Sequence, residues 1–232
     1  MSLQQLAADL LLAVKRREDA TPLISRLARL PVGVLKANLS TDEQKKAFWI
    51  NCYNAFFLHL RRDQGVEKPT IYRNQLCRIA GQDFSLDEIE HGILRRYRAK
   101  RGAGFLPNLF TPRHIRKLAV DRIDFRIHFA LNCGAISCPP IAFYTPEQID
   151  QQLEIATTSF LENDTWFEPE KNEVHFSRLG LWYLGDFGGP HGIRKIVQHY
   201  LKVGQPSSQI IFNDYNWEEN LDNFVDYQLS TI

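Results

Sequence analysis

Residues 41–62 constrain the fold more than any other segment, because they predict a helix with almost no polar side. Ser40 is a favoured N-cap residue, and Glu43 completes the spacing of a capping box. Between residues 47 and 60 the sequence reads AFWINCYNAFFLHL, which is apolar nearly all round a helical turn. A helix of this kind must be buried on most sides, so we expect the rest of the chain to pack around it.

The few polar side chains of this helix need partners inside the protein. An unpaired buried amide costs about 1–3 kcal/mol, and Asn51 and Asn54 share one helix face because they are three residues apart. The pattern favours a structural hydrogen-bond network over a direct catalytic role for the two amides. Cys52 lies in the most apolar part of the helix and is expected to be an inert core thiol.

The segment FRIHFALNCGAISCPP, residues 125–140, is the densest in reactive side chains. Its first half alternates apolar and polar or small residues, the period-two pattern of a strand with two unlike faces. We therefore predict a strand over residues 125–132 at the centre of the fold. The apolar face would carry Phe125, Ile127, Phe129 and Leu131, and the other face Arg126, His128, Ala130 and Asn132.

Two thiols follow this predicted strand, Cys133 next to a glycine and Cys138 before a double proline. A thiol enzyme needs a thiolate, a base and a group that orients the base. Cys133 is the candidate nucleophile, because the adjacent glycine lets the chain turn sharply and expose the sulfur. His128 would lie roughly 16 Å away along an extended strand, so a histidine from another element, His91, is an equally good candidate base.

His91 belongs to a third informative segment, EHGILR at residues 90–95. Ser85 and Glu88 form a capping-box pattern that predicts a helix reaching about residue 98. His91 and Arg95 would share a face of it. Gly92 costs about 1 kcal/mol relative to alanine inside a helix, a cost that is accepted where another backbone approaches closely. This glycine favours a buried role over a solvated one for the charged residues around it, Glu90, His91 and Arg95.

Shorter signals complete the expected order of elements. We predict α+β architecture, a mainly helical single domain over residues 1–232 around a small antiparallel sheet, because no repeat, low-complexity linker or domain boundary is visible. The remaining expected elements are helices over 3–17 and from 21 to before 31, a hairpin over 76–85, a loop over 100–112, a helix over 146–162, a hairpin over 165–177, a helix over 190–201 and a strand near 209–212.

Composition excludes several classes of protein. Lys and Arg number 28 against 27 Asp and Glu, so the net charge of +1 gives no electrostatic reason to expect nucleic acid or a membrane as partner. No apolar run has the length of a membrane span, and the first residues do not resemble a signal peptide because their charges follow the apolar part. Four cysteines in 232 residues do not form a secreted disulfide framework, so we expect a cytoplasmic protein with reduced thiols.

Two other uses of the thiols stay open. A metal site would take His91, His128, Cys133 and Cys138, although no second cysteine pair supports it. A redox site would join Cys133 and Cys138 in a reversible disulfide, although their spacing is wider than the usual CxxC. No phosphate-binding glycine loop, GxSxG elbow or paired-histidine zinc helix is present, and no motif requires a cofactor.

Four ordered blocks resemble the family of domains of unknown function 547: FWINCYNAF at 48–56, IEHGILR at 89–95, RIHFALNCGAISCPP at 126–140 and YTPE at 144–147. The resemblance implies a family core over roughly 40–165, with helices before it and a helical extension after it, and no established activity. The chain departs from the family where Arg96 and Tyr97 replace a glycine and an asparagine that follow the second block in many relatives, and where Cys52 replaces a small or aliphatic residue. The family's signature positions correspond to Asn51, Tyr53, Asn54, Glu90, His91, Arg95, His128, Cys133 and Cys138.

A buried helix packed against a sheet, with cysteine and histidine nearby, also resembles the papain and transglutaminase architecture at the level of the fold. The leading hypothesis is a thiol-dependent hydrolase or transferase that acts on amide or thioester-like bonds of a small molecule or peptide. Its assigned residues are Cys133 as nucleophile, His91 or His128 as base, Asn51 or Asn54 as orienting group, and Arg95, Arg126, Glu90 and Cys138 as substrate contacts. The competing hypothesis is a non-catalytic binding or scaffold domain, in which the same residues form a closed polar network.

Overall fold

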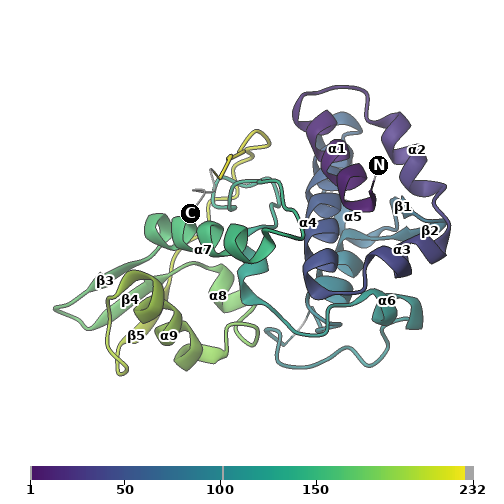
Figure 1. Cartoon of the computed structure of the whole chain (residues 1–232). Coiled ribbons are helices and arrows are strands. Elements are labelled where there is room, and N and C mark those ends of the chain that lie inside the picture. Colours follow the sequence, from purple (N-terminus) through teal and green to yellow (C-terminus); the bar gives the residue numbers. More distant parts are fainter. Residues whose placement is uncertain (1, 101, 228–232) are drawn as a thin grey trace.

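The computed structural model describes residues 2–100 and 102–227, and it confirms a mainly helical α+β fold with two small sheets (Figure 1). The α-helices are α1 (Leu3–Lys15), α2 (Thr21–Ala28), α3 (Val32–Asn38), α4 (Asp42–Leu58), α5 (Thr70–Arg73), α6 (Arg113–Leu118), α7 (Ile149–Asp164), α8 (Leu179–Trp182) and α9 (Gly189–Leu201). The strands are β1 (Cys77–Ile79), β2 (Gln82–Phe84), β3 (Trp166–Glu168), β4 (Glu173–Phe176) and β5 (Gln209–Phe212). Three further helical segments are the π-helices η1 (His59–Asp63) and η2 (Glu88–Leu94) and the 3-10 helix η3 (Phe125–Phe129).

Helix α4 is the centre of the N-terminal half, as its all-round apolar sequence predicts. Every residue from Lys45 to Leu58 is buried, and α1 packs along the helix (Figure 1). The N-cap is Thr41 rather than Ser40, because Thr41 has the extended backbone that a cap requires. Thr41 forms the capping box with Gln44, so the predicted box with Glu43 is wrong by one residue. Beyond Leu58 the helix continues as η1.

Two hydrophobic clusters divide the core. The first surrounds α4 and includes α1 and the predicted hairpin β1–β2, whose strands pair antiparallel. The second lies in the C-terminal half, where α7 and α9 pack beside the sheet β3–β4–β5 (Figure 1). Strands β3 and β4 are antiparallel, but β4 and β5 are parallel, so only part of the predicted antiparallel pairing holds. That residues 1–232 form one domain stays a prediction.

The predicted strand over residues 125–132 is wrong. Residues 125–129 form η3, and the Asp124 side chain caps it by accepting a hydrogen bond from the Arg126 backbone N–H at 3.1 Å. Successive residues of a 3-10 helix point about 120° apart, so alternate residues do not share a face as they would in a strand. Ile127 therefore joins the first hydrophobic cluster, whereas Phe125 and Phe129 join the second.

The segment containing His91 is the predicted helix, with two differences. The Ser85–Glu88 capping box is present, since Glu88 N–H donates to Ser85 Oγ at 3.1 Å and Ser85 N–H donates to Glu88 Oε2 at 2.9 Å. The helix ends at Leu94 instead of residue 98 and has π-helical geometry as η2. A Cβ on Gly92 would lie 2.6 Å from Ile115 Cγ2, so the close neighbour is a side chain of α6 and not a backbone.

The later predicted elements are close to their expected positions. The helix predicted from residue 146 begins at Ile149 in α7, because Gln148 is its N-cap. The hairpin over 165–177, the helix over 190–201 and the strand over 209–212 correspond to β3–β4, α9 and β5. Among the residues that the structure describes, no helix is long and apolar enough to span a membrane. The cytoplasmic location stays a prediction.

Candidate functional site

A cavity of about 450 Å³ opens where the two hydrophobic clusters meet. Both thiols of the 125–140 segment and both candidate histidines line it, although they come from segments far apart in sequence. The structure therefore brings together Cys133, Cys138, His91, His128 and Glu90. The cavity is also lined by Tyr53, Tyr72, Asp87, Lys100, Leu131, Pro139, Leu179, Trp182, Tyr183, Tyr215 and Trp217.

A tight turn places the two thiols against each other. Asn132 holds the turn with its amide, which accepts from Gly134 N–H at 2.6 Å and donates to Pro139 O at 2.7 Å. Gly134 has a φ of 77°, a value that favours glycine. Cys133 Sγ consequently lies 2.7 Å from Cys138 Sγ.

A tyrosine from the C-terminal segment completes the thiol group. Tyr215 Oη lies 3.1 Å from Cys138 Sγ and 3.4 Å from Cys133 Sγ. Backbone hydrogen bonds hold this segment against the thiol turn: Ile136 N–H donates to Glu218 O at 2.8 Å. Cys133, Cys138 and Tyr215 are called the thiol wall below.

The two cysteines of the thiol wall have pKa values shifted in opposite directions. A hydrogen bond from Cys138, helped by Tyr215 and the charge of Lys68, lowers the pKa of Cys133 to about 6 although burial opposes this. Burial and the adjacent Cys133 raise the pKa of Cys138 well above its usual value. Burial likewise raises the pKa values of Cys52 and Cys77. Cys133 is therefore the thiol that ionises near neutral pH.

The two histidines that line the cavity are held by a buried cluster around Asp186, which does not itself line the cavity. Arg95 Nε donates to Asp186 Oδ2 at 2.5 Å, and His128 Nε2 lies 2.9 Å from the same oxygen. Arg95 Nη1 also lies 2.7 Å from His91 Nδ1. The side chains of Arg95, Asp186 and His128 are at most 1% exposed. Arg95, Asp186, His91 and His128 are called the charged wall below.

In the charged wall Asp186 is ionised, whereas His91 and His128 are neutral. Burial disfavours the charge on Asp186, but hydrogen bonds from His128 and Arg95 outweigh it and lower the pKa. Burial lowers the pKa values of His91 and His128 more than the neighbouring carboxylates raise them. At neutral pH Asp186 is therefore a carboxylate, and the imidazoles of His91 and His128 are neutral.

Glu90 and Tyr183 extend the charged wall into the cavity. Burial disfavours the ionised form of Glu90, but interactions with His91 and with the Arg95 guanidinium outweigh burial and lower its pKa. Tyr53 Oη donates to Glu90 Oε2 at 3.4 Å, whereas the buried Glu90 Oε1 has no hydrogen-bond partner in the described part of the chain. The Tyr183 ring stacks on His128 with centroids 3.9 Å apart, so it fixes the plane of the imidazole.

Asn51 and Asn54 lie away from the reactive groups, and the backbone satisfies both amides. Asn51 donates to Tyr144 O at 2.8 Å and accepts from Tyr144 N–H at 3.1 Å. Asn54 donates to Ala130 O at 2.9 Å and accepts from Asn132 N–H at 3.0 Å. The two amides thus fix the segment around the thiols to α4, which agrees with the structural network favoured by their spacing.

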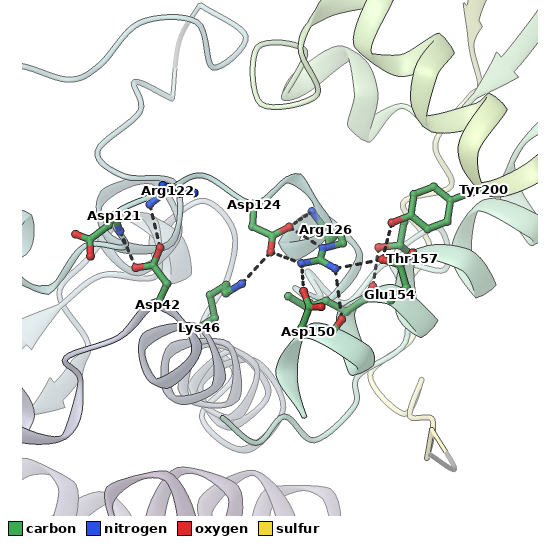
Figure 2. A network of polar contacts seen from close by, with 11 residues as sticks. Asp42, Lys46, Asp121, Arg122, Asp124, Arg126, Asp150, Glu154, Thr157 and Tyr200 are labelled. Atoms are coloured by element: carbon green, nitrogen blue, oxygen red, sulfur yellow. Dashed lines mark hydrogen bonds and ion pairs between the residues drawn. The ribbon is translucent and has the colours of Figure 1, made fainter. Parts of the chain in front are cut away.

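Arg126 does not line the cavity, which corrects its grouping with the other site residues. It belongs to a separate ion-pair network that joins α4 to α7 through η3 (Figure 2). Its guanidinium lies 2.9 Å from Asp124 Oδ2 and 2.6 Å from Asp150 Oδ1, and Asp124 also pairs with Lys46 at 2.9 Å. The error follows from the strand prediction, because only a strand would place Arg126 on the same face as His128.

Sequence reasoning missed the groups that complete both walls. Neither Asp186 nor Tyr215 is among the residues that the sequence assigns to the site. Asp186 lies more than fifty residues from His128, and Tyr215 lies more than fifty residues from Cys138, so no local spacing reveals either pairing. A weak signal was the pair of aromatic residues Tyr215 and Trp217, since clustered aromatic residues often line a cavity.

The metal alternative finds no support in the cavity. In residues 2–100 and 102–227, the only His, Cys, Asp and Glu side chains that converge closely enough for a metal ion are Glu168, Glu173 and His175. They lie on β3 and β4, and none of the three lines the cavity. All four cysteines are free thiols.

The family described as "Protein of unknown function, DUF547" matches residues 37–161, more than half of the chain. The chain belongs to this family. The match confirms the resemblance carried by the four sequence blocks, and it covers α4, η2 and the thiol turn. Asp186 and Tyr215 lie beyond the matched residues. No curated protein and no solved structure matches the chain, so the papain-like architecture stays a prediction.

Proposed function

We propose that this family member is a thiol-dependent hydrolase or transferase that acts on amide or thioester-like bonds, with Cys133 as nucleophile. The observation that carries the proposal is that Cys133, whose pKa is lowered to about 6, lines the same cavity as a histidine held by a buried carboxylate. Nucleophile, base and orienting group are the three parts that such chemistry requires. A cavity of about 450 Å³ suits a small molecule or the end of a peptide.

His128 is the better candidate base of the two histidines. With Asp186 accepting from Nε2–H, the lone pair of the neutral ring is on Nδ1. His91 instead uses Nδ1 to accept from Arg95, so its Nε2 carries the proton. Asp186 takes the orienting role that the sequence assigned to Asn51 or Asn54, and Arg95 supports Asp186 instead of contacting substrate.

The proposed reaction has two steps. The Cys133 thiolate attacks the carbonyl carbon, the new S–C bond forms and the C–N or C–S bond breaks. An amine leaves with the bonding electron pair and takes a proton from water, whereas a thiolate leaves with the pair alone. Water, or an acceptor in a transferase, then attacks the thioester while His128 Nδ1 takes its proton, the Cys133 thiolate is expelled, and His128 returns the proton to solvent. Glu90 and Cys138 contact the substrate from the lining of the cavity.

The test is reactivity of the four thiols, resolved by mass spectrometry after iodoacetamide labelling over a pH series. We expect Cys133 to label with a midpoint near pH 6 and far faster than Cys52 and Cys77, because only thiolates alkylate. A thioester probe should then leave an acyl group on Cys133, and His128→Ala should slow its release more than His91→Ala. Labelling of Cys133 as slow as that of Cys52 would contradict the proposal and favour the binding or scaffold domain.

A second candidate function is thiol–disulfide exchange, which the 2.7 Å separation of the two sulfurs favours. Here the Cys133 thiolate attacks a substrate disulfide and releases one thiolate, and Cys138 then attacks the mixed disulfide and releases the other. Cys138→Ser separates the two functions, because it keeps a hydroxyl donor beside Cys133 but cannot form the second disulfide. Exchange would stop at the mixed disulfide in this variant, whereas acyl transfer would continue.

A further inference from the structure

The loop between η2 and α6 exposes a cluster of large apolar side chains, here called the apolar loop: Phe105, Leu106, Leu109 and Phe110. Their exposed fractions are 53%, 64%, 74% and 92%. The loop runs along the lower edge of the view in Figure 1, ahead of α6. Soluble proteins expose single apolar side chains routinely, but four within six residues mark an interaction surface.

Hydrogen bonds from neighbouring residues hold the backbone that carries these exposed side chains. Arg98 Nη1 donates to Phe105 O at 2.7 Å, and Arg116 Nε donates to Thr111 O at 2.9 Å. Arg116 Nη2 also donates to Leu109 O. Ala99 N–H donates to Leu106 O at 2.9 Å. The backbone carbonyls of Phe105, Leu106 and Leu109 thus accept hydrogen bonds within the protein, while the side chains are exposed.

The charged side chains of the segment that carries the apolar loop, residues 91–120, are all basic. Residues 91–120 contain no aspartate or glutamate, so the near-neutral net charge of the whole chain hides a basic region. Arg96, Arg113, Arg116 and Lys117 are exposed, and none of them forms an ion pair with any other residue that the structure describes. An apolar tip flanked in sequence by exposed basic side chains that form no ion pair with the described residues is complementary to an anionic lipid bilayer.

We propose that the apolar loop is a peripheral membrane-binding element, which inserts its phenylalanines and leucines into an anionic bilayer while the surrounding arginines and lysine contact the headgroups. A membrane fits better than nucleic acid, because leucine side chains offer no aromatic face for stacking on bases. The near-neutral net charge alone predicted no membrane partner, because a sum of charges does not report how they are distributed.

The loop also contacts the candidate site. A Cβ on Gly104, directly before Phe105, would lie 2.6 Å from Arg95 Nη2 and 2.7 Å from Asp186 Oδ1. Gly185 N–H donates to Ala103 O at 2.6 Å. The apolar loop is therefore anchored on the charged wall of the cavity, and Lys100 lines the cavity itself. Binding to a bilayer would hold the cavity near the membrane surface.

The experiment is co-sedimentation of the full chain with vesicles of phosphatidylcholine alone or of phosphatidylcholine with phosphatidylserine. We expect binding only to the anionic vesicles, and weaker binding as salt is added. Arg113→Gln/Lys117→Gln should lower the partition coefficient roughly thirty-fold, since each basic residue contributes about fivefold near an anionic surface. Leu109→Ser/Phe110→Ser should lower it by roughly tenfold or more.

Matched controls make the result specific to this loop. Val32→Ser/Leu76→Ser removes two apolar side chains that are each 40% exposed elsewhere, and Arg26→Gln/Lys195→Gln removes two exposed charges from α2 and α9. Both controls should bind vesicles like the original chain. All changed side chains are exposed, so unaltered melting temperatures will show that the variants fold.

Three outcomes would overturn the proposal. The first is no binding to anionic vesicles, and the second is equal loss of binding in the control variants. The third is binding of a single-stranded oligonucleotide, or dimerisation seen by light scattering, that the Leu109→Ser/Phe110→Ser change abolishes while vesicles are not bound. None of these depends on Cys133, so failure here leaves the thiol chemistry to its own test.

Discussion

The two walls of the cavity satisfy their polar groups in opposite ways. In the charged wall, Arg95, Asp186 and His128 are at most 1% exposed, and ion pairs and hydrogen bonds keep their charges fixed. In the thiol wall, Cys133, Cys138 and Tyr215 are weak acids that share hydrogen bonds, and one proton leaves near pH 6.

This difference separates positioning from reactivity. A buried ion pair holds geometry, because breaking it leaves an uncompensated charge in a medium of low dielectric constant. A thiol that ionises near neutral pH supplies a nucleophile. In the proposed function the charged wall orients His128 and the thiol wall carries the covalent chemistry, and each of the following changes tests one of the two walls.

The largest effect is expected in the charged wall, from Asp186→Asn. The change leaves the buried Arg95 without a counter-charge, so we expect the free energy of unfolding to fall by about 3–5 kcal/mol. Asp83→Asn is the matched control, because Asp83 pairs with Arg78 at the surface, where the two side chains are 46% and 57% exposed. Urea denaturation should show a loss below about 1 kcal/mol for the control. Equal losses would mean that the charged wall is not a structural unit.

A smaller effect of the same wall is expected in the pH dependence of stability. The pKa values of His91 and His128 are lower in the folded protein than the ordinary value of 6.5. Below pH 6.5 the unfolded chain therefore binds more protons, and stability falls as the pH decreases towards the folded pKa values. Each histidine contributes at most about 1.4 kcal/mol per pH unit.

Urea denaturation between pH 7 and pH 5 measures this slope. The lowered pKa values of Glu90 and Asp186 act in the same direction, but only below pH 5, where carboxylates begin to gain protons. The double variant His91→Gln/His128→Gln should flatten the slope between pH 6.5 and pH 5. A slope that is unchanged in this variant would place the acid sensitivity outside the charged wall.

The thiol wall should respond in reactivity rather than in stability. Cys138→Ala removes the hydrogen bond that lowers the pKa of Cys133 most. A hydrogen bond to a charged group contributes about 1.5–3 kcal/mol, so we expect that pKa to rise by about one to two units. The pH profile of iodoacetamide labelling at Cys133 measures the change. Cys138→Ser, which keeps a donor, is the control and should shift the profile less.

The sequence predicted those parts of the fold and of the site that depend on local periodicity. Helix α4 was predictable because an all-round apolar helix has only one environment that suits it, and the capping box at Ser85 and Glu88 located η2. The relation of His91 to Arg95 followed from helical spacing. These features depend on local periodicity, which the sequence states directly.

The rest depended on contacts between distant residues. The period-two pattern over 125–132 was real, but the cap from Asp124 made a 3-10 turn, so His128 and Arg126 point to different sites. The partners Asp186 and Tyr215 come from the C-terminal half, outside the residues that match the family. Alternation alone cannot distinguish a strand from a short turn whose cap lies just before it.

The smallest effect is expected from Tyr215, and it tests how much this residue contributes to the lowered pKa of Cys133. Tyr215→Phe removes the more distant donor, 3.4 Å from Cys133 Sγ, and keeps the ring packed against Trp182 and Trp217 at centroid distances of 4.8 Å and 4.6 Å. We therefore expect the pKa of Cys133 to rise by less than about one unit, with little loss of stability. Tyr200→Phe removes a hydroxyl that donates to Glu154 at 2.8 Å and lies outside the cavity, so it should leave the Cys133 profile unchanged. A shift as large as that of Cys138→Ala would make Tyr215 the principal donor, and no shift would leave Cys138 as the residue that sets the reactivity of Cys133.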